Sequence, residues 1–343
     1  MLKYLKLRGI EDKDYGKNNN NTPCNYDYSI TAVNKEVLSE LKNIPQNIFK
    51  LSYESSKSYK FPNKLSKLLK IPNKYIRITA GGERALNIST EILLSNNTTT
   101  IITIPNFPRI SLLAKYRSNS VKFVKVTENL KKLKKVINGT EVIFIANPIT
   151  PIGKYIKTNE VIEIIKHNIS TIFVIDMSLF DFTGSRNIDI QKLIKLKNVI
   201  VILSFSKCLG LPGLRIGSFI SSNTNILNAF DKLASAYELS SLSLNLCEYL
   251  FKKNLSNLNQ KSNRLIKQNY DLLRKANFKN ITYHDDNCFI TSIVSKDKES
   301  LHKKLLLNGF KTLDLKNFEG MEHTNGVRIT MNSIPINFLK LLK

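Results

Sequence analysis

The stretch "VILSFSKCLGLPGLRIGSFI" (residues 201–220) joins two short β-rich runs through a turn that carries one lysine and one arginine. Ser204, Ser206 and Lys207 directly follow the first run, and Arg215 lies eight residues beyond Lys207. Hydroxyls, a guanidinium and backbone N–H groups together make a favourable phosphate site. A lysine in a partly dry site can have a lowered pKa and act as an amine nucleophile. The stretch therefore predicts an anion site beside a reactive amine.

Seven β-rich runs form a regular series, and helical patterns separate several of them. The runs lie at residues 75–79, 99–104, 120–126, 141–146, 171–176, 198–204 and 215–221. Runs that are apolar on both faces and alternate with helices indicate a mainly parallel sheet covered on both sides. We therefore predict an α/β fold, with a mainly parallel seven-stranded sheet, helices on both faces and a smaller α+β domain after it.

The pattern along the chain also suggests domain boundaries. Residues 1–45 are interpreted as an N-terminal arm, because the first 30 are polar and end in "KNNNNTPCNYDYS", which indicates an extended segment rather than a packed element. Residues 46–250 form the predicted large domain. A long helical stretch over about 225–275 leads into residues 251–343, the predicted small C-terminal domain.

The net charge of +25 allows a nucleic acid or an acidic membrane surface as a partner. Most basic residues are lysines scattered singly or in pairs, and the densest cluster, "NLKKLKKV" (129–136), reads as one amphipathic helix. No nucleic-acid-binding motif accompanies the charge, so we do not expect such a partner. We expect no membrane segment either, because no apolar run approaches the ~20 residues that span a bilayer.

The cysteines and histidines indicate whether a metal site is to be expected and in which cellular compartment the protein is found. The four cysteines, at 24, 208, 247 and 288, form no CxxC pair, and the four histidines stand isolated, so we expect no metal site. The N-terminus lacks the apolar core of a signal peptide. These features predict a cytoplasmic protein with free thiols.

Ligands bind at the carboxyl ends of strands in such sheets, so the residues after each run are informative. Gly81 and Gly82 open a helix whose N–H groups can approach an anion. Phe107 could stack on a flat ring or fill the core, and Asp176 would be costly to bury without a cation. A phosphate grip, a stacking ring, a carboxylate and the Lys207 amine together match pyridoxal phosphate, whose aldehyde forms a Schiff base with lysine.

Over residues 50–335 the chain resembles the fold-type-I pyridoxal-phosphate enzymes. Within them it is most similar to class I/II aminotransferases of the histidinol-phosphate aminotransferase branch. Its most specific segment, "SFSKCLGLPGLRIG", resembles the family's serine-x-serine-lysine motif with an arginine eight residues later. The resemblance implies that Lys207 carries the cofactor and that Ser204, Ser206 and Arg215 hold its phosphate. The large domain would then be the cofactor-binding domain.

Further matches follow in the family's order. "TAGGERA" resembles the loop that binds the phosphate, which implies roles for Gly82 and Glu83 beside Gly81. By the same resemblance, Phe107 would stack on the pyridine ring and Asp176 would pair with its nitrogen. "GVRITMNS" resembles the segment whose arginine, here Arg328, grips the substrate's α-carboxylate.

A looser match concerns the neighbouring subunit. Tyr53 lies at about the spacing of the family's tyrosine that reaches the phosphate of the partner subunit, and Tyr59 competes for that position. The match implies a homodimer.

Three segments depart from the family's pattern. The turn "NPITPIG" places Thr150 where the family has an asparagine that contacts the cofactor's phenolic oxygen. "DMSLFDF" places Leu179 where the family has a tyrosine that touches the same oxygen. Losing both hydrogen bonds to an ionised oxygen should alter the cofactor's electronics. The family's N-terminal substrate-binding segment is not recognisable in "TPCNYDYSIT".

We predict a pyridoxal-phosphate-dependent aminotransferase that acts on an amino acid or an amino-acid-like compound and on a keto acid. Lys207 would move the proton between the substrate's Cα and the cofactor. One alternative is a decarboxylase resembling threonine-phosphate decarboxylase, or another biosynthetic enzyme that uses this cofactor. From a different class, a non-catalytic binding protein that keeps the fold is the other alternative.

Overall fold

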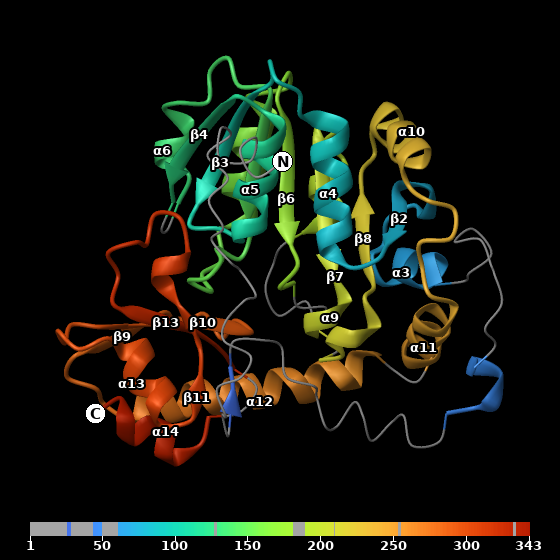
Figure 1. Ribbon diagram of the computed structural model, residues 1–343. Helices are drawn as coiled ribbons and strands as arrows, with labels where there is room; N and C mark the ends of the chain where they lie inside the picture. Colours follow the sequence, from blue (N-terminus) through green and yellow to red (C-terminus); the bar gives the residue numbers. More distant parts are fainter. Residues whose placement is uncertain are drawn as a thin grey trace, which may run out of the picture.

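The computed structural model describes residues 26–28, 44–49, 61–126, 129–180, 189–208, 210–252, 255–331 and 334–343 (Figure 1). Its main sheet has seven strands in the order β2-β8-β7-β6-β5-β3-β4. Strand β8 runs antiparallel to β2 and β7, and the other pairings are parallel. The strands are β2 (Ile76–Thr79), β3 (Thr99–Ile104), β4 (Ser120–Lys125), β5 (Val142–Ala146), β6 (Ile172–Met177), β7 (Val199–Ser204) and β8 (Gly217–Ile220). All seven predicted strands are confirmed.

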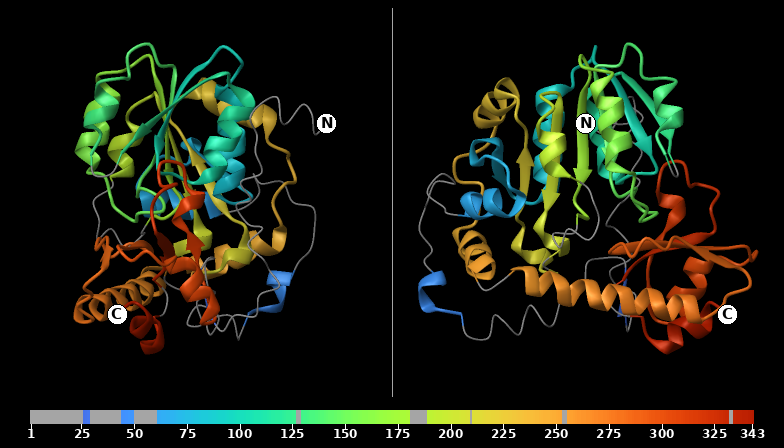
Figure 2. Two further views of the ribbon diagram at one scale, coloured as in Figure 1. Left: turned by 60° about the vertical axis from the view of Figure 1, so that its left-hand side comes forward. Right: turned by 180° about the vertical axis from the view of Figure 1, so that it is seen from behind.

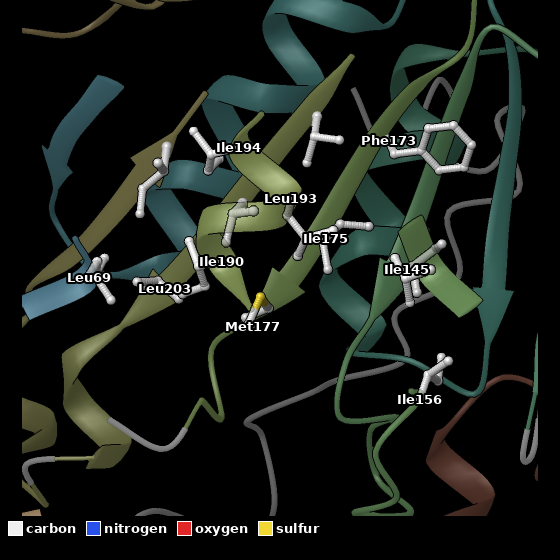
Figure 3. Close-up of a cluster of buried hydrophobic side chains, with 14 of the residues drawn as sticks. Leu69, Ile145, Ile156, Phe173, Ile175, Met177, Ile190, Leu193, Ile194 and Leu203 are labelled. Carbon is white, nitrogen blue, oxygen red and sulfur yellow. The ribbon is translucent and has the colours of Figure 1, made fainter. Parts of the chain in front are cut away.

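Both faces of the central strands β5, β6 and β7 are buried, because alternate residues point to opposite sides of the sheet and helices cover both sides. Figure 3 shows Ile145, Ile175, Met177 and Leu203 on one face, packed near the side chains of α8 (Ile190–Ile194). Their neighbours along the strands belong to a second cluster on the opposite face. Continuous apolar runs therefore fit strands covered from both sides, as the sequence predicted.

Helices of the large domain divide between the two faces. One face is covered by α3 (Phe61–Leu69), α6 (Lys131–Lys134), α7 (Thr158–Lys166), α8 and α11 (Ser241–Lys252). The other is covered by α4 (Gly82–Leu93), α5 (Pro108–Arg117) and α10 (Thr224–Leu233). Short elements complete this part: α9 (Phe205–Cys208), η1 (Gln46–Phe49), η3 (Asn73–Tyr75) and η4 (Pro212–Leu214).

A second, four-stranded antiparallel sheet has the order β12-β13-β10-β9. It comprises β9 (Ile281–Tyr283), β10 (Ile290–Ser295), β12 (Leu313–Asp314) and β13 (Gly326–Thr330), with α13 (Leu301–Leu307), α14 (Ile336–Leu341) and η5 (Leu315–Asn317). This unit matches the predicted smaller α+β domain. The domain boundaries at 45/46 and 250/251 stay a prediction.

The predicted helical stretch at 225–275 consists of three helices, α10, α11 and α12 (Leu255–Lys275). Figures 1 and 2 show α12 running below the main sheet to the small one. Its C-terminal half packs into the small-domain core through Ile266, Tyr270 and Leu273. The helix therefore connects the two sheets physically, as well as along the chain.

Residues 26–28 differ from the expected unpacked arm. Strand β1 (Tyr26–Asp27) pairs in parallel with β11 (Phe310–Lys311). The Tyr26 and Phe310 rings stack with centroids 5.3 Å apart, and Tyr28 is only 5% exposed in the small-domain core. Aromatic burial against Phe310 and Phe338 accounts for the packing of this otherwise polar segment.

Candidate functional site

The carboxyl ends of β2, β5, β6 and β7 and the start of β8 meet at one edge of the main sheet. Gly217 lies opposite both Thr79 and Ser204, and Asp176 lies opposite Ala146. This register brings together segments that are far apart in the sequence. The edge holds most of the residues that the sequence singled out.

Close packing of glycines places the start of α4 against the turn before β8. A Cβ on Gly81 would lie 2.7 Å from Nη2 of Arg215, and a Cβ on Gly82 would lie 3.2 Å from Cβ of Ser204. Gly81 has a φ of +84° and a ψ of 167°, a conformation open essentially to glycine alone. The N–H groups at the start of this 12-residue helix therefore lie beside a guanidinium and a hydroxyl, as an anion site requires.

Arg215 has a left-handed backbone, with a φ of 49° and a ψ of 49°. This conformation costs a non-glycine residue about 1–2 kcal/mol. Its exposed guanidinium is held beside Gly81. An arginine at a position that favours glycine indicates that the side chain has a role there.

Two predicted residues lie at this edge in less direct ways. The Glu83 side chain is 45% exposed, and its Oε1 lies 3.3 Å from Nε of Arg109. Because the side chain is paired with Arg109, only the backbone of Glu83 is available to the anion site at the start of α4. Phe107 lies at the exit of β3, directly before α5, and is half-buried against the apolar cluster of the large domain. This position is compatible with both predicted roles of Phe107, stacking on a ligand's ring and filling the core.

Lys207 lies in α9, immediately after β7. Burial lowers the pKa of its amine to about 7, and the positive charges of Arg328 and Arg215 act in the same direction. Its neighbour Ser206 is 3% exposed, and its Oγ has no hydrogen-bond partner among the described residues. A buried hydroxyl of this kind calls for a partner, and the described residues do not supply one.

Asp176 is the next-to-last residue of β6 and is 7% exposed. Burial raises the pKa of its carboxyl group, and two hydrogen bonds from Ser178 oppose that rise. The Ser178 N–H donates to Asp176 Oδ1 at 2.9 Å, and the Ser178 hydroxyl donates to the same oxygen at 2.5 Å. Sequence reasoning missed Ser178. The pattern Asp-x-Ser could have indicated it, because an Asp side chain often accepts from the N–H two residues on.

The small domain contributes Arg328, which lies in β13 and is 4% exposed. Its cross-strand neighbour Ser292 donates a hydrogen bond to Pro151 O at 3.0 Å. The Tyr155 N–H donates to Asp286 Oδ2 at 2.9 Å. These bonds tie the turn after β5 to the small sheet, and they hold Arg328 near Lys207.

The positions that depart from the family's pattern make structural contacts. The Thr150 hydroxyl donates to Pro148 O at 3.5 Å, and Leu179 packs against the small-domain core. The Asn147 amide donates to Ile156 O at 3.0 Å, and its Oδ1 accepts from Ile156 N–H at 2.9 Å. Asn147 is therefore occupied in shaping the turn.

Not every predicted residue can be placed. Tyr53 and its competitor Tyr59 lie outside the described residues. Within the described ranges, no helix has the length and apolar character to cross a bilayer. No group of three or more metal-binding side chains occurs in the same ranges.

The residues at the sheet edge fit pyridoxal phosphate. The glycine cradle, Arg215 and the Ser206 hydroxyl, which has no partner within the described ranges, suit a phosphate. A lysine with a pKa of about 7 suits a reaction with an aldehyde, and a buried carboxylate suits a protonated ring nitrogen. These residues could therefore hold such a cofactor, with Arg215, Ser206 and the start of α4 available to its phosphate and Asp176 available to its ring nitrogen.

Comparison with known proteins agrees with this chemistry. The pattern of the family "aminotransferase class I and II" matches residues 25–335. Histidinol-phosphate aminotransferase of Hydrogenobaculum sp. is 25% identical over 338 residues, covering 93% of both chains. The enzyme of that name from Campylobacter jejuni subsp. doylei is 30% identical over 280 residues, covering 75% of this chain and 73% of its own.

Solved structures have the same fold. Histidinol-phosphate aminotransferase from Clostridium acetobutylicum superposes with a TM-score of 0.79 at 19% identity, over 93% of this chain and 98% of its own. L-threonine-O-3-phosphate decarboxylase from Porphyromonas gingivalis gives 0.75 at 20% identity, over 92% and 96%. At such identities the likeness concerns the fold, which both enzymes share. The family pattern spans nearly the whole chain, and the chain therefore belongs to the class I and II aminotransferase family as a pyridoxal-phosphate-dependent aminotransferase.

Proposed function

We propose that Lys207 is the residue that binds the cofactor covalently and carries the proton in the reaction. The observation behind this proposal is the Lys207 amine, whose pKa is lowered to about 7 by burial and by the positive charges of Arg328 and Arg215. An amine with a pKa of about 7 is neutral in about half of the molecules near pH 7; the neutral form can attack an aldehyde, and once released it can accept a proton.

The remaining cofactor contacts are proposed from the same edge of the sheet. Ser204, Ser206, Arg215 and the start of α4, with the backbone of Glu83, would bind the phosphate. Asp176 would pair with the ring nitrogen and Phe107 would stack on the ring. Thr150 would lie on the side of the phenolic oxygen.

Bound pyridoxal phosphate supplies a ring that accepts electrons from the substrate's Cα. Lys207, freed when the substrate's amine replaces it, would accept the Cα proton and donate it back, and addition of water would then release a keto product while the amino group stays with the cofactor. Asp176 would keep the ring nitrogen protonated, which requires the carboxyl group to stay ionised despite its burial. Arg328 would orient the substrate by a bidentate bond to its α-carboxylate.

For the substrate, we propose an amine with an anionic group that Arg328 can bind. The relatives named histidinol-phosphate aminotransferases support an amino-acid-like donor of this kind. A carboxylate and a phosphate each offer a pair of oxygens that can accept two parallel hydrogen bonds from the guanidinium of an arginine. The keto-acid partner follows from the transaminase reaction.

The proposal extends to a homodimer in which Tyr53 of the partner reaches the cofactor phosphate. Size-exclusion chromatography with light scattering should give twice the mass of 39.1 kDa. A monomeric holoenzyme would contradict it. The cytoplasmic location stays a prediction.

One experiment tests the function. The holoenzyme is mixed with candidate donors, a carboxyl-labelled amino acid and histidinol phosphate among them, and pyridoxamine phosphate is measured by mass spectrometry. Transamination produces pyridoxamine phosphate and a keto product from at least one donor. Release of labelled carbon dioxide without pyridoxamine phosphate would instead support decarboxylation. Binding of the cofactor with neither product from any donor would favour a binding protein.

A further inference from the structure

Ser178 and Asp176 form a compact unit at the end of β6. The Ser178 backbone N–H and hydroxyl donate to one oxygen of Asp176, Oδ1, at 2.9 and 2.5 Å. Among the described residues no hydrogen bond reaches the second oxygen, Oδ2. The carboxylate therefore has one oxygen fixed by its own chain and one oxygen left for a ligand.

Ser178 also contacts the phosphate end of the site. A Cβ on Gly82 would lie 2.8 Å from Ser178 Oγ, so the hydroxyl lies directly beside the first residue of α4. The neighbouring glycine leaves space for this hydroxyl and restricts where it can turn. Ser178 is thus held between the carboxylate and the start of α4.

We propose that Ser178 is a positioning residue that orients Asp176 so that Oδ2 meets the ring nitrogen of bound pyridoxal phosphate. The inference rests on the proposed function, because it requires Asp176 to face that nitrogen. Two donors on Oδ1 stop the carboxylate from rotating. They also favour its charged form, whereas burial favours the neutral form.

The experiment measures cofactor affinity rather than activity. Apo protein is dialysed against pyridoxal phosphate, and separately against an analogue with carbon in place of the ring nitrogen. Losing one hydrogen bond to a charged group costs about 1.5–3 kcal/mol, so Ser178→Ala should weaken binding of pyridoxal phosphate roughly tenfold or more. Binding of the analogue should be unchanged, because the analogue has no nitrogen for Asp176 to meet.

Two further variants make the test specific. Ser178→Ala added to Asp176→Asn should cause no further loss, because the serine acts through the carboxylate. The matched control is Ser221→Ala. Ser221 is a buried serine whose hydroxyl donates to Val199 O at 2.8 Å. It directly follows the last residue of β8, whereas Gly217, beside the site, is the first. The control variant should bind both ligands as the wild type does.

Three results would overturn the inference. Ser178→Ala could bind pyridoxal phosphate as tightly as the wild type, it could lose affinity equally for both ligands, or its loss could add to that of Asp176→Asn. A wild-type protein that binds neither ligand would overturn the proposed function as well, so the two failures are distinguishable.

Discussion

Gly217 offers a sharp test of the packing at the sheet edge. An ideal Cβ on this residue would lie 2.5 Å from the carbonyl carbon of Gly81 and 2.5 Å from the nitrogen of Gly82. Real Cβ atoms do not approach so closely, and both neighbours are backbone atoms that cannot rotate away. Gly217→Ala must therefore push the start of α4 away from β8, which opens the proposed phosphate cradle.

The expected cost follows from this geometry. An extra methyl group in a well-packed interior costs about 1–3 kcal/mol, and the rigid peptide at Gly81–Gly82 places this case at the upper end. Gly213 provides the control, because it lies two residues before Arg215, as Gly217 lies two after, and a Cβ there meets nothing within 4 Å. Gly213→Ala should change stability by no more than about 0.5 kcal/mol.

The assay combines thermal unfolding of the apo proteins, followed by circular dichroism, with dialysis against pyridoxal phosphate. Gly217→Ala should melt several degrees below the wild type and bind the cofactor weakly, whereas Gly213→Ala should match the wild type in both. Equal melting temperatures and affinities for the two variants would refute the reasoning, because the close approach of β8 to α4 would then be of no consequence.

Two other predictions concern the lysine and the N-terminal strand. Arg328→Leu removes a positive charge that lowers the pKa of Lys207. The midpoint of the pH dependence of cofactor capture, measured by stopped-flow absorbance, should therefore move above its value near 7. An unchanged or lower midpoint would contradict this. Tyr28→Phe should raise the free energy of unfolding by about 1 kcal/mol, because the buried hydroxyl has no partner among the described residues. Tyr28→Ala should lower it by about 3–5 kcal/mol, and denaturant titrations in which both variants behave alike would argue against the burial of that ring.

The main sheet was predictable from the sequence because its central strands, β5, β6 and β7, are nearly continuous apolar runs. The run at 99–104 matches β3 residue for residue, and the boundaries of the other strands differ from the predicted ones by at most two residues. Such runs can be buried on both faces only in a covered sheet, which leaves few alternatives. The position of the site at the carboxyl ends followed from the same rule.

Other features depend on contacts that no local pattern records. Strands β1 and β11 have two residues each and pair Tyr26 with Phe310, far along the chain, so neither has a detectable periodicity. The approach of Arg328 to Lys207 requires the small sheet to be held against the turn after β5. The role of Ser178 was hidden because Asp-x-Ser is a common pattern, and only the fold shows that both donors reach one oxygen.

Lys207, one of 52 lysines and arginines in the chain, is the residue proposed to bind the cofactor. The most direct measurement is borohydride reduction of the holoenzyme, followed by peptide mass spectrometry. The visible absorbance band should disappear, and a reduced pyridoxyl group should be found on the peptide that contains Lys207. A label on another lysine, or no label on a protein saturated with pyridoxal phosphate, would contradict it.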